Sequence, residues 1–206
     1  MDPVLVAAEM AIKESSDELN PLVVTGQLVS EAKSARTAGD YFALAIATCG
    51  VGYIPVAPGT FGSLVGIGIY FLLQRLVLSN ATSTNLFRLS SLFVAVELIA
   101  ITVLTLAGIW AASRTEKLAG RKDPGKVVID EVAGQLIALL PVVTGSGWIT
   151  VGSAFLLFRF FDITKPYPAR RLEYLESGLG IMADDLITGA YAAVGVASIV
   201  VVLQFS

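Results

Sequence analysis

Acidic and basic side chains stand at the edges of long apolar segments in this sequence, where a charge is costly. The chain has 206 residues, of which 55% are hydrophobic and 15% charged. Ionisable residues in such surroundings are functional candidates. They are Asp130 and Glu131, then Arg159, Asp162 and Lys165, and finally Asp184 and Asp185. Acids from several helices at one depth predict a site for a hard cation such as Mg²⁺, which takes carboxylate and phosphate oxygens as ligands.

The spacing of these residues suggests separate roles for them. Adjacent residues on a helix point about 100° apart, so one acid of each pair can face a central site and the other a neighbouring helix. Arg159 and Asp162 share a helix face, and Arg159 and Lys165 are suited to holding phosphate oxygens. Structural interpretations stay open: helix capping for the acid pairs, an ion pair for Arg159 and Asp162, and a membrane anchor for Lys165.

A loop rich in proline and glycine precedes the first long apolar segment, and its composition suits an anion. Its sequence is PGTFGS, residues 58–63. We expect Thr60 or Ser63 to cap the following helix, which leaves backbone N–H groups aimed at a phosphate. The candidate substrate site is then Gly59, Thr60, Gly62 and Ser63, together with Arg159, Lys165 and Asp123. A simple turn is the alternative for this loop, as it is for Asp123.

The residue types that are absent narrow the chemistry. There is no histidine, which excludes Ser-His-Asp hydrolases, phosphatases with a histidine nucleophile and HExxH metalloproteases. The one cysteine, Cys49, cannot form an intramolecular disulfide, and we expect it to be a small apolar packing residue. The net charge is −3 and there is no basic tract, so nucleic acid is not an expected partner.

Long apolar segments must position the candidate residues, and they predict an all-α membrane protein. Five of them are long enough to span a bilayer as helices, although the fourth is marginal alone: residues 61–78, 91–112, 127–144, 148–163 and 184–205. Residues 41–55 are apolar but shorter. Their glycines and prolines predict a half-helix or re-entrant element followed by an irregular loop. The expected fold is a polytopic helix bundle with about five spanning helices.

Basic residues in the connections predict the orientation of the bundle. Residues 113–126 contain five and residues 164–183 contain three, whereas residues 79–90 contain one. The positive-inside rule places the two basic connections and the N-terminus in the cytoplasm. Five crossings then leave the C-terminus outside, and all the candidate clusters fall at the cytoplasmic face of a multi-pass protein.

The first 40 residues differ from the rest. Residues 1–40 are expected to form a cytosolic or interfacial helical extension to a membrane-embedded domain over 41–206. Their acidic start, with no long apolar core behind it, does not fit a signal peptide. We expect the extension to lie on the membrane or on the body of the protein; a partner-binding or dimerising arm is the alternative. A homodimer through small-residue faces, such as those at Gly66 and Gly134, also stays open.

Four motifs, in order, resemble the signatures of phosphatidylglycerophosphatase A, a family of bacterial membrane lipid phosphatases. They are GYIPVAPGTFGSL at 52–64, DPGKVVIDEVAG at 123–134, RFFDITKPYP at 159–168 and GLGIMADDLITG at 178–189. The resemblance covers about residues 41–205. It implies an inner-membrane, magnesium-dependent enzyme that hydrolyses phosphatidylglycerophosphate to phosphatidylglycerol and phosphate. The chain departs from the family in its acidic N-terminus and at Thr188, where a small apolar residue is common.

With this resemblance we expect five acids to share the magnesium site: Asp130, Glu131, Asp162, Asp184 and Asp185. Arg159, Lys165, Thr60 and Ser63 would offset charge on the transferring phosphoryl group. One carboxylate would act as general base towards water. A phospho-aspartyl intermediate is the rival route, and we prefer direct attack by water because the DxDx(T/V) motif of aspartate-nucleophile phosphatases is absent.

Three other functions remain as alternatives. The first is a phosphatase for another lipid phosphate, such as phosphatidic acid. The second is a CDP-alcohol phosphotransferase, although the DGxxAR and GxxxDxxxD pattern of that family is absent. The third is a non-enzymatic cation carrier. A cation path should continue through the membrane, whereas the outer half offers only Arg75 and Glu97, and we expect Glu97 to make a helix–helix contact.

Overall fold

The computed structural model describes residues 36–80, 85–142, 147–172 and 174–205. The second of the two units of the chain, Ala38–Ser206, contains the helices given below. Because the described residues begin at 36, the predicted N-terminal extension over residues 1–40 lies almost wholly outside them. The described residues form helices and contain no strand, which confirms the all-α class. The elements are α3 (Ala38–Thr48), η1 (Val51–Tyr53), α4 (Pro58–Ser79), α5 (Leu86–Ala119), α6 (Ile129–Leu139), α7 (Trp148–Thr164), α8 (Ala169–Leu172) and α9 (Ser177–Gln204).

Among the described residues, three helices are long and apolar enough to cross a membrane: α4, α5 and α9. They have 22, 34 and 28 residues, or about 33, 51 and 42 Å at 1.5 Å per residue. The other two segments predicted to span are also helical. α6 has 11 residues and α7 has 17, fewer than the roughly 20 that a single crossing needs. The chain is therefore a polytopic membrane protein with helices of unequal length.

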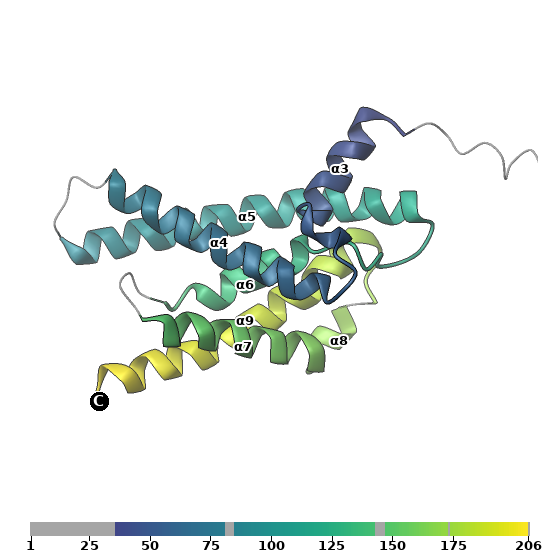
Figure 1. The fold of residues 1–206 in the computed structure, drawn as a ribbon. Helices are drawn as coiled ribbons and strands as arrows, with labels where there is room; N and C mark the ends of the chain where they lie inside the picture. Colours follow the sequence, from purple (N-terminus) through teal and green to yellow (C-terminus); the bar gives the residue numbers. More distant parts are fainter. Residues whose placement is uncertain (1–35, 81–84, 143–146, 173, 206) are drawn as a thin grey trace, which may run out of the picture. The chain divides into compact units, whose positions relative to one another are not determined.

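The helices that carry the four motifs alternate in direction. Figure 1 shows that one end of the second unit holds the starts of α4, α6 and α9 together with the last turns of α5 and α7. The half-helix α3 lies at the same end, and η1 and an irregular segment lead from it into α4, as the sequence predicted for residues 41–55. The four motifs therefore meet at one end of the bundle.

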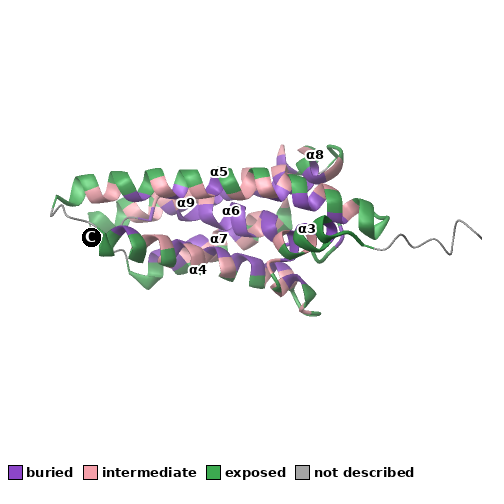
Figure 2. Ribbon diagram, turned by 90° about the horizontal axis from the view of Figure 1, so that it is seen from above, coloured by how far each residue is buried: buried purple, intermediate pink, exposed green. Residues whose placement is uncertain are grey.

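α6 is the innermost helix of this unit (Figure 2). Nine of its eleven residues are buried, and it packs against α9, α4, α5 and α7. The long helices around it bury only 22–28% of their most apolar stretches within the chain. Their outward faces carry exposed apolar side chains such as Leu72, Ile99 and Val202. Helices that expose this much apolar surface are suited to contact with lipid.

Glycines allow α6 to approach its neighbours closely. A Cβ at Gly134 would lie 2.7 Å from the carbonyl oxygen of Asp185, and a Cβ at Gly189 would overlap the backbone of Gly134. On the other side, a Cβ at Gly62 or Gly66 would lie about 3 Å from atoms of α6 or of the residue that precedes it. The small-residue faces at Gly66 and Gly134 are thus used within this chain, and a homodimer stays a prediction.

The last helix begins earlier than expected. α9 starts at Ser177 and not at 184, so Asp184 and Asp185 lie two turns inside it and do not form its N-terminus. The expectation of an acid pair that opens this helix is wrong. Glycine disfavours helix in an isolated chain, but here Gly178 packs closely on α5. A Cβ at Gly178 would overlap the carbonyl oxygen of Ile109, and the Gly178 N–H donates to the Ser113 hydroxyl at 3.0 Å. Tertiary packing therefore extends the helix over residues that the sequence assigned to a loop.

Candidate active site

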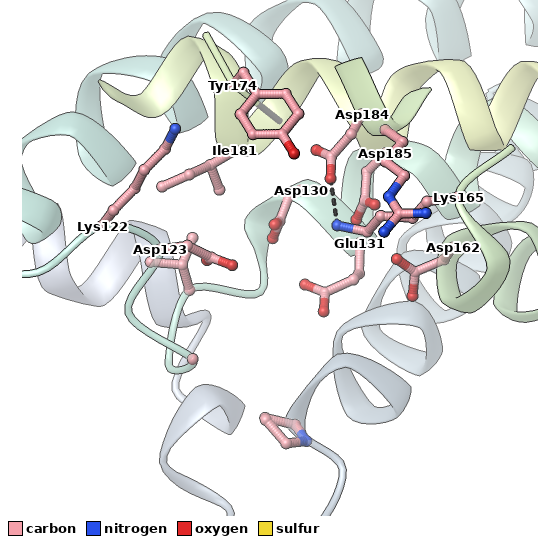
Figure 3. Close-up of a pocket in the computed structure, with 14 residues that line it drawn as sticks. Lys122, Asp123, Asp130, Glu131, Asp162, Lys165, Tyr174, Ile181, Asp184 and Asp185 are labelled. Atoms are coloured by element: carbon pink, nitrogen blue, oxygen red, sulfur yellow. Dashed lines mark hydrogen bonds and ion pairs between the residues drawn. The ribbon is translucent and has the colours of Figure 1, made fainter. Parts of the chain in front are cut away.

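A cavity of about 580 Å³ opens where the four motifs meet (Figure 3). Its volume lies within the range of about 300–1,000 Å³ that is usual for small-ligand pockets. Seven residues singled out in the sequence line it: Asp123, Asp130, Glu131, Asp162, Lys165, Asp184 and Asp185. The cavity is therefore strongly acidic, with a smaller number of bases in its walls.

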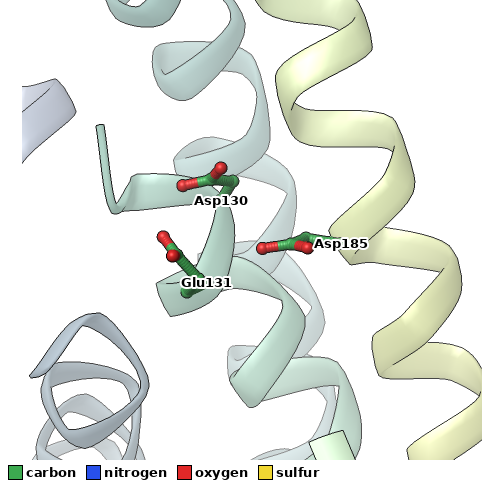
Figure 4. Close-up of side chains that lie close together, drawn as sticks. All are labelled: Asp130, Glu131 and Asp185. Carbon is green, nitrogen blue, oxygen red and sulfur yellow. The ribbon is translucent and has the colours of Figure 1, made fainter. Parts of the chain in front are cut away.

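Three of the carboxylates form a close group. Oxygen atoms of Asp130, Glu131 and Asp185 all lie within 4.8 Å of one another. Figure 4 shows the three side chains converging from the first turn of α6 and from α9. Asp130 and Asp185 are buried, and Glu131 is half-buried. Oδ1 of Asp130 and Oε2 of Glu131 have no hydrogen-bond partner among the described residues.

This carboxylate group, Asp130, Glu131 and Asp185, fits a hard divalent cation. Like charges this close repel one another, and buried oxygens that lack a donor lose free energy that water would have supplied. A bound cation would offset both costs. Because every donor atom is a carboxylate oxygen, the site suits Mg²⁺ or a similar hard ion and not a metal that prefers sulfur or nitrogen ligands.

Backbone contacts fix the position of the carboxylate group. The amide of Val128 donates to the carbonyl of Ala47 at 2.8 Å, which attaches the start of α6 to α3. Gly59, in the first turn of α4, lies against the same region. A Cβ at Gly59 would overlap Oε1 of Glu131 and come within 3.0 Å of the Arg159 guanidinium. The absence of a side chain at Gly59 thus leaves space for the Glu131 carboxylate.

The other two acids of the predicted magnesium site, Asp162 and Asp184, are paired with bases. Nζ of Lys165 lies 2.5 Å from Oδ2 of Asp184, and this pair, drawn as a dashed line in Figure 3, joins the end of α7 to α9. Nη1 of Arg159 lies 2.6 Å from Oδ2 of Asp162, within α7. The ion pair that the sequence left open for Arg159 and Asp162 is therefore present. Both pairs hold a base beside the carboxylate group.

The proline- and glycine-rich loop supports the site and contributes only Pro58 to the cavity wall. The N-cap of α4 is Ala57, and its side chain makes no capping hydrogen bond. The expected cap by Thr60 or Ser63 is wrong, because Pro58 starts the helix and places both residues inside it. Ser63 is fully buried, and its hydroxyl donates to the carbonyl of Gly59 at 3.1 Å.

Three further polar residues line the cavity and were not predicted as site residues: Lys122, Arg170 and Tyr174. Lys122 lies in the turn between α5 and α6, next to Asp123, whose φ of 45° also confirms its place in a turn. In the sequence, Lys122 and Arg170 look like the basic residues common in any cytoplasmic connection between membrane helices. Nothing in their spacing distinguishes Lys122 from its neighbour Arg121, which does not line the cavity.

Cys49 lies close enough to Glu131 for that charge to affect its thiol, and the thiol is weakly reactive. Its thiol donates to the carbonyl of Ile46 at 3.3 Å. Burial, with a smaller contribution from the negative charge of Glu131, raises the pKa of the Cys49 thiol from 9.0 to about 11. Because the thiolate is the nucleophilic form, Cys49 is not a nucleophile at neutral pH. This agrees with the packing role expected from the sequence.

Comparison with known families places the four motifs in a single family. The family model described as phosphatidylglycerophosphatase A matches residues 44–200, which is most of the chain and includes the whole carboxylate group. The chain belongs to the phosphatidylglycerophosphatase A family. Members of this family are lipid phosphatases, so the acidic cavity is the candidate active site of a phosphatase.

Three curated relatives align with most of this chain. A Bacteroides thetaiotaomicron protein named "Putative phosphatidylinositol-3-phosphatase" is 38% identical over 153 residues, 72% of this chain and 86% of the relative. Phosphatidylglycerophosphatase A of Haemophilus influenzae is 38% identical over 151 residues, 73% of this chain and 83% of the relative. Phosphatidylglycerophosphatase A of Escherichia coli is 32% identical over 145 residues, with shares of 70% and 74%. No solved structure shows a significant match to the chain.

Proposed function

We propose that this chain removes the terminal phosphate of phosphatidylglycerophosphate, giving phosphatidylglycerol and phosphate, with Mg²⁺ held by the carboxylate group. The relatives from Haemophilus influenzae and Escherichia coli bear the name of this reaction. The observation that carries the mechanism is the convergence of Asp130, Glu131 and Asp185 inside the cavity. A lipid phosphate is reached at a membrane surface, and the cavity opens at one end of helices able to span a membrane.

The carboxylate group would supply the protein ligands of the metal. Mg²⁺ takes one or two carboxylates, keeps several waters and accepts substrate phosphate as a further ligand. Bound here, Mg²⁺ would polarise the phosphoryl oxygens and lower the pKa of a water molecule. Asp162 and Asp184 are each paired with a base, so we assign them the role of holding Arg159 and Lys165 beside the phosphate.

Residues of the chain would then have separate roles in the hydrolysis. Lys165 and Arg159 donate hydrogen bonds to the phosphoryl oxygens and offset the charge that develops there. One carboxylate of the group takes a proton from the attacking water. The water oxygen forms a bond to phosphorus as the bond from phosphorus to the glycerol oxygen breaks, and the proton held by the carboxylate passes to that oxygen to give the hydroxyl group of phosphatidylglycerol.

We also propose that the cavity faces the cytoplasm and that the protein lies in a bacterial inner membrane. The eight bases of the two connections at this end support this orientation through the positive-inside rule. The test uses a Cys49→Ala background and a membrane-impermeant maleimide. Cysteine at Arg121 should react only after cells are permeabilised, and cysteine at Phe205 should react in intact cells. The opposite pattern would reverse the orientation.

A second substrate is favoured by one specific observation. The Bacteroides thetaiotaomicron relative has a name that refers to phosphatidylinositol 3-phosphate. Phosphate release from purified protein should therefore be compared on phosphatidylglycerophosphate, phosphatidylinositol 3-phosphate and phosphatidic acid, in non-ionic micelles at equal mole fraction. We expect the highest kcat/KM on phosphatidylglycerophosphate. A higher value on either of the other two lipids would replace it as the proposed substrate.

A further inference from the structure

The cavity has a second polar region that the proposed hydrolysis does not use. Figure 3 shows the Lys122 side chain on the opposite side of the cavity from Lys165 and Asp162, with the Tyr174 hydroxyl pointing inwards between them. Ile181 contributes apolar surface to the same wall. Lys122, Tyr174 and Ile181, here called the distal wall, thus combine a cation, a hydroxyl group and an apolar side chain.

Lys122 is available to a ligand. Within the ranges that the structure describes, each of the bases Lys165 and Arg159 is paired with an acid, whereas Lys122 and Arg170, which also line the cavity, form no ion pair. Of these two, Lys122 lies on the same wall as Ile181 and the Tyr174 hydroxyl. Asp123 is the next residue, but Figure 3 shows its side chain pointing in a different direction. An unpaired lysine in the wall of a largely acidic cavity is the expected partner of an anion that lies away from the carboxylate group.

The backbone that carries Lys122 is well held. The preceding helix ends at Gly120, in the left-handed conformation with φ of 63°. After Lys122, the amides of Lys126 and Val127 both donate to the carbonyl of Pro124, at 2.5 and 2.9 Å. The hydrogen bond from Val128 to α3 then leads into α6. Lys122 is therefore presented from a turn that is fixed at both ends.

We propose that Lys122 and Tyr174 bind the phosphodiester of the substrate, the second phosphate that joins the head group to diacylglycerol. This inference rests on the proposed function. In a lipid that carries a phosphomonoester and a phosphodiester on one short polyol, binding of the monoester at the carboxylate group leaves the diester elsewhere in the same cavity. Lys122 offers it a cation, Tyr174 a hydroxyl donor and Ile181 an apolar contact for the carbons between them. Phosphatidic acid has only one phosphate and cannot use the distal wall in this way.

The experiment compares Lys122→Gln, Tyr174→Phe and the matched control Arg121→Gln. Arg121 has the same charge, is exposed in the same turn and does not line the cavity. The measurements are the KM and kcat for phosphatidylglycerophosphate, and the inhibition constant of phosphatidic acid in the same non-ionic micelles. Loss of one exposed charged contact should raise KM by about three- to tenfold. The inhibition constant of phosphatidic acid should change by less than KM does, and Arg121→Gln should move neither.

Two results would overturn the proposal. One is an equal rise of both constants in Lys122→Gln, which would indicate a general effect of charge or of folding. The other is an unchanged KM for phosphatidylglycerophosphate in Lys122→Gln. This result would overturn the proposal even if Arg170→Gln, a change at the other unpredicted base, raises the KM. Thermal unfolding of each variant in detergent shows whether it is folded. Failure of the proposed function itself is seen separately, because wild-type protein would then release no phosphate from phosphatidylglycerophosphate.

Discussion

Gly134 of α6 and Gly189 of α9 lie in backbone contact, each one helical turn after an acid of the carboxylate group. Gly134 follows Asp130 by four residues, and Gly189 follows Asp185 by four. A Cβ at Gly189 would overlap the carbonyl of Gly134. Because residues four apart lie one above the other on a helix, the separation of the two backbones at the glycines determines how near the two acids can be.

Gly189→Ala should therefore separate α6 from α9 and disperse the carboxylate group. Forcing a methyl group into a close-packed contact costs about 1–3 kcal/mol, and the displaced acids should reduce phosphatase activity by more than the loss of stability explains. The measurements are the melting temperature in detergent and the rate of phosphate release at a temperature where the variant is folded.

Gly68→Ala is the matched control for this substitution. Gly68 also lies in a helix, but a Cβ there would meet no atom within 4 Å. Since alanine is the better helix former by about 1 kcal/mol, this variant should keep its activity and lose no stability. A Gly189→Ala protein with wild-type melting temperature and activity would show that the glycine contact does not determine the site.

Magnesium should stabilise the protein through the carboxylate group. A ligand that binds only the folded state at 100 times its Kd adds about 2.7 kcal/mol, so the melting temperature should rise when Mg²⁺ replaces EDTA. Asp185→Asn should lose this rise. In EDTA the same variant should be as stable as wild type or more stable, because one of three repelling carboxylates is gone. Glu176→Gln, an exposed acid outside the cavity, should keep the full magnesium effect.

The melting temperature is measured without substrate, so this test does not depend on phosphatase activity. An undiminished magnesium-dependent rise in Asp185→Asn would place the metal at other residues.

Lys165→Met should destabilise the fold because it leaves Asp184 as a buried charge without its ion-pair partner. Breaking one side of such a pair costs about 1–3 kcal/mol when the lost base is partly exposed. The double variant Lys165→Met with Asp184→Asn should recover part of the stability but none of the activity, if Lys165 also holds the phosphate. Lys117→Met, an exposed lysine in the last turn of α5, is the control. If the losses of stability caused by Lys165→Met and by Asp184→Asn simply add in the double variant, the two side chains are not directly paired.

Cys49 should react slowly with thiol reagents in the folded protein, and in a pH-dependent way. With the thiol pKa raised to about 11, the group is protonated below that pH, and at pH 8 roughly one thiol in a thousand is ionised. The rate of alkylation should rise about tenfold for each pH unit between 7 and 10. Cys49→Ala should retain phosphatase activity. A rate that levels off near pH 9 would indicate an unshifted thiol.

The sequence predicts much of this architecture for simple physical reasons. Apolar segments of known length indicate membrane helices, and acids at their edges indicate where a cation and a phosphate meet. Asp130 and Glu131 therefore lie at the start of α6 as predicted, and Arg159 pairs with Asp162 as the three-residue spacing allows.

The parts that could not be predicted depend on tertiary packing. Whether Asp184 or Asp185 joins the carboxylate group is decided by the rotation of α9 against α6, which the glycine contact determines and no local pattern reports. The early start of α9 depends on the packing of Gly178 against α5. Lys122 belongs to the cavity wall because of how its turn is placed, whereas its spacing in the sequence is that of any basic loop residue.

The most direct test of the central claim measures phosphate release from phosphatidylglycerophosphate by purified protein in non-ionic detergent. Wild type and Asp130→Asn are each assayed with Mg²⁺ and then with EDTA, and each is first shown to be folded by its thermal transition. We predict release by wild type that depends on Mg²⁺ and is abolished by EDTA, and a rate at least about a hundredfold lower in Asp130→Asn. Full activity of Asp130→Asn, or release by wild type that EDTA leaves unchanged, would contradict the account.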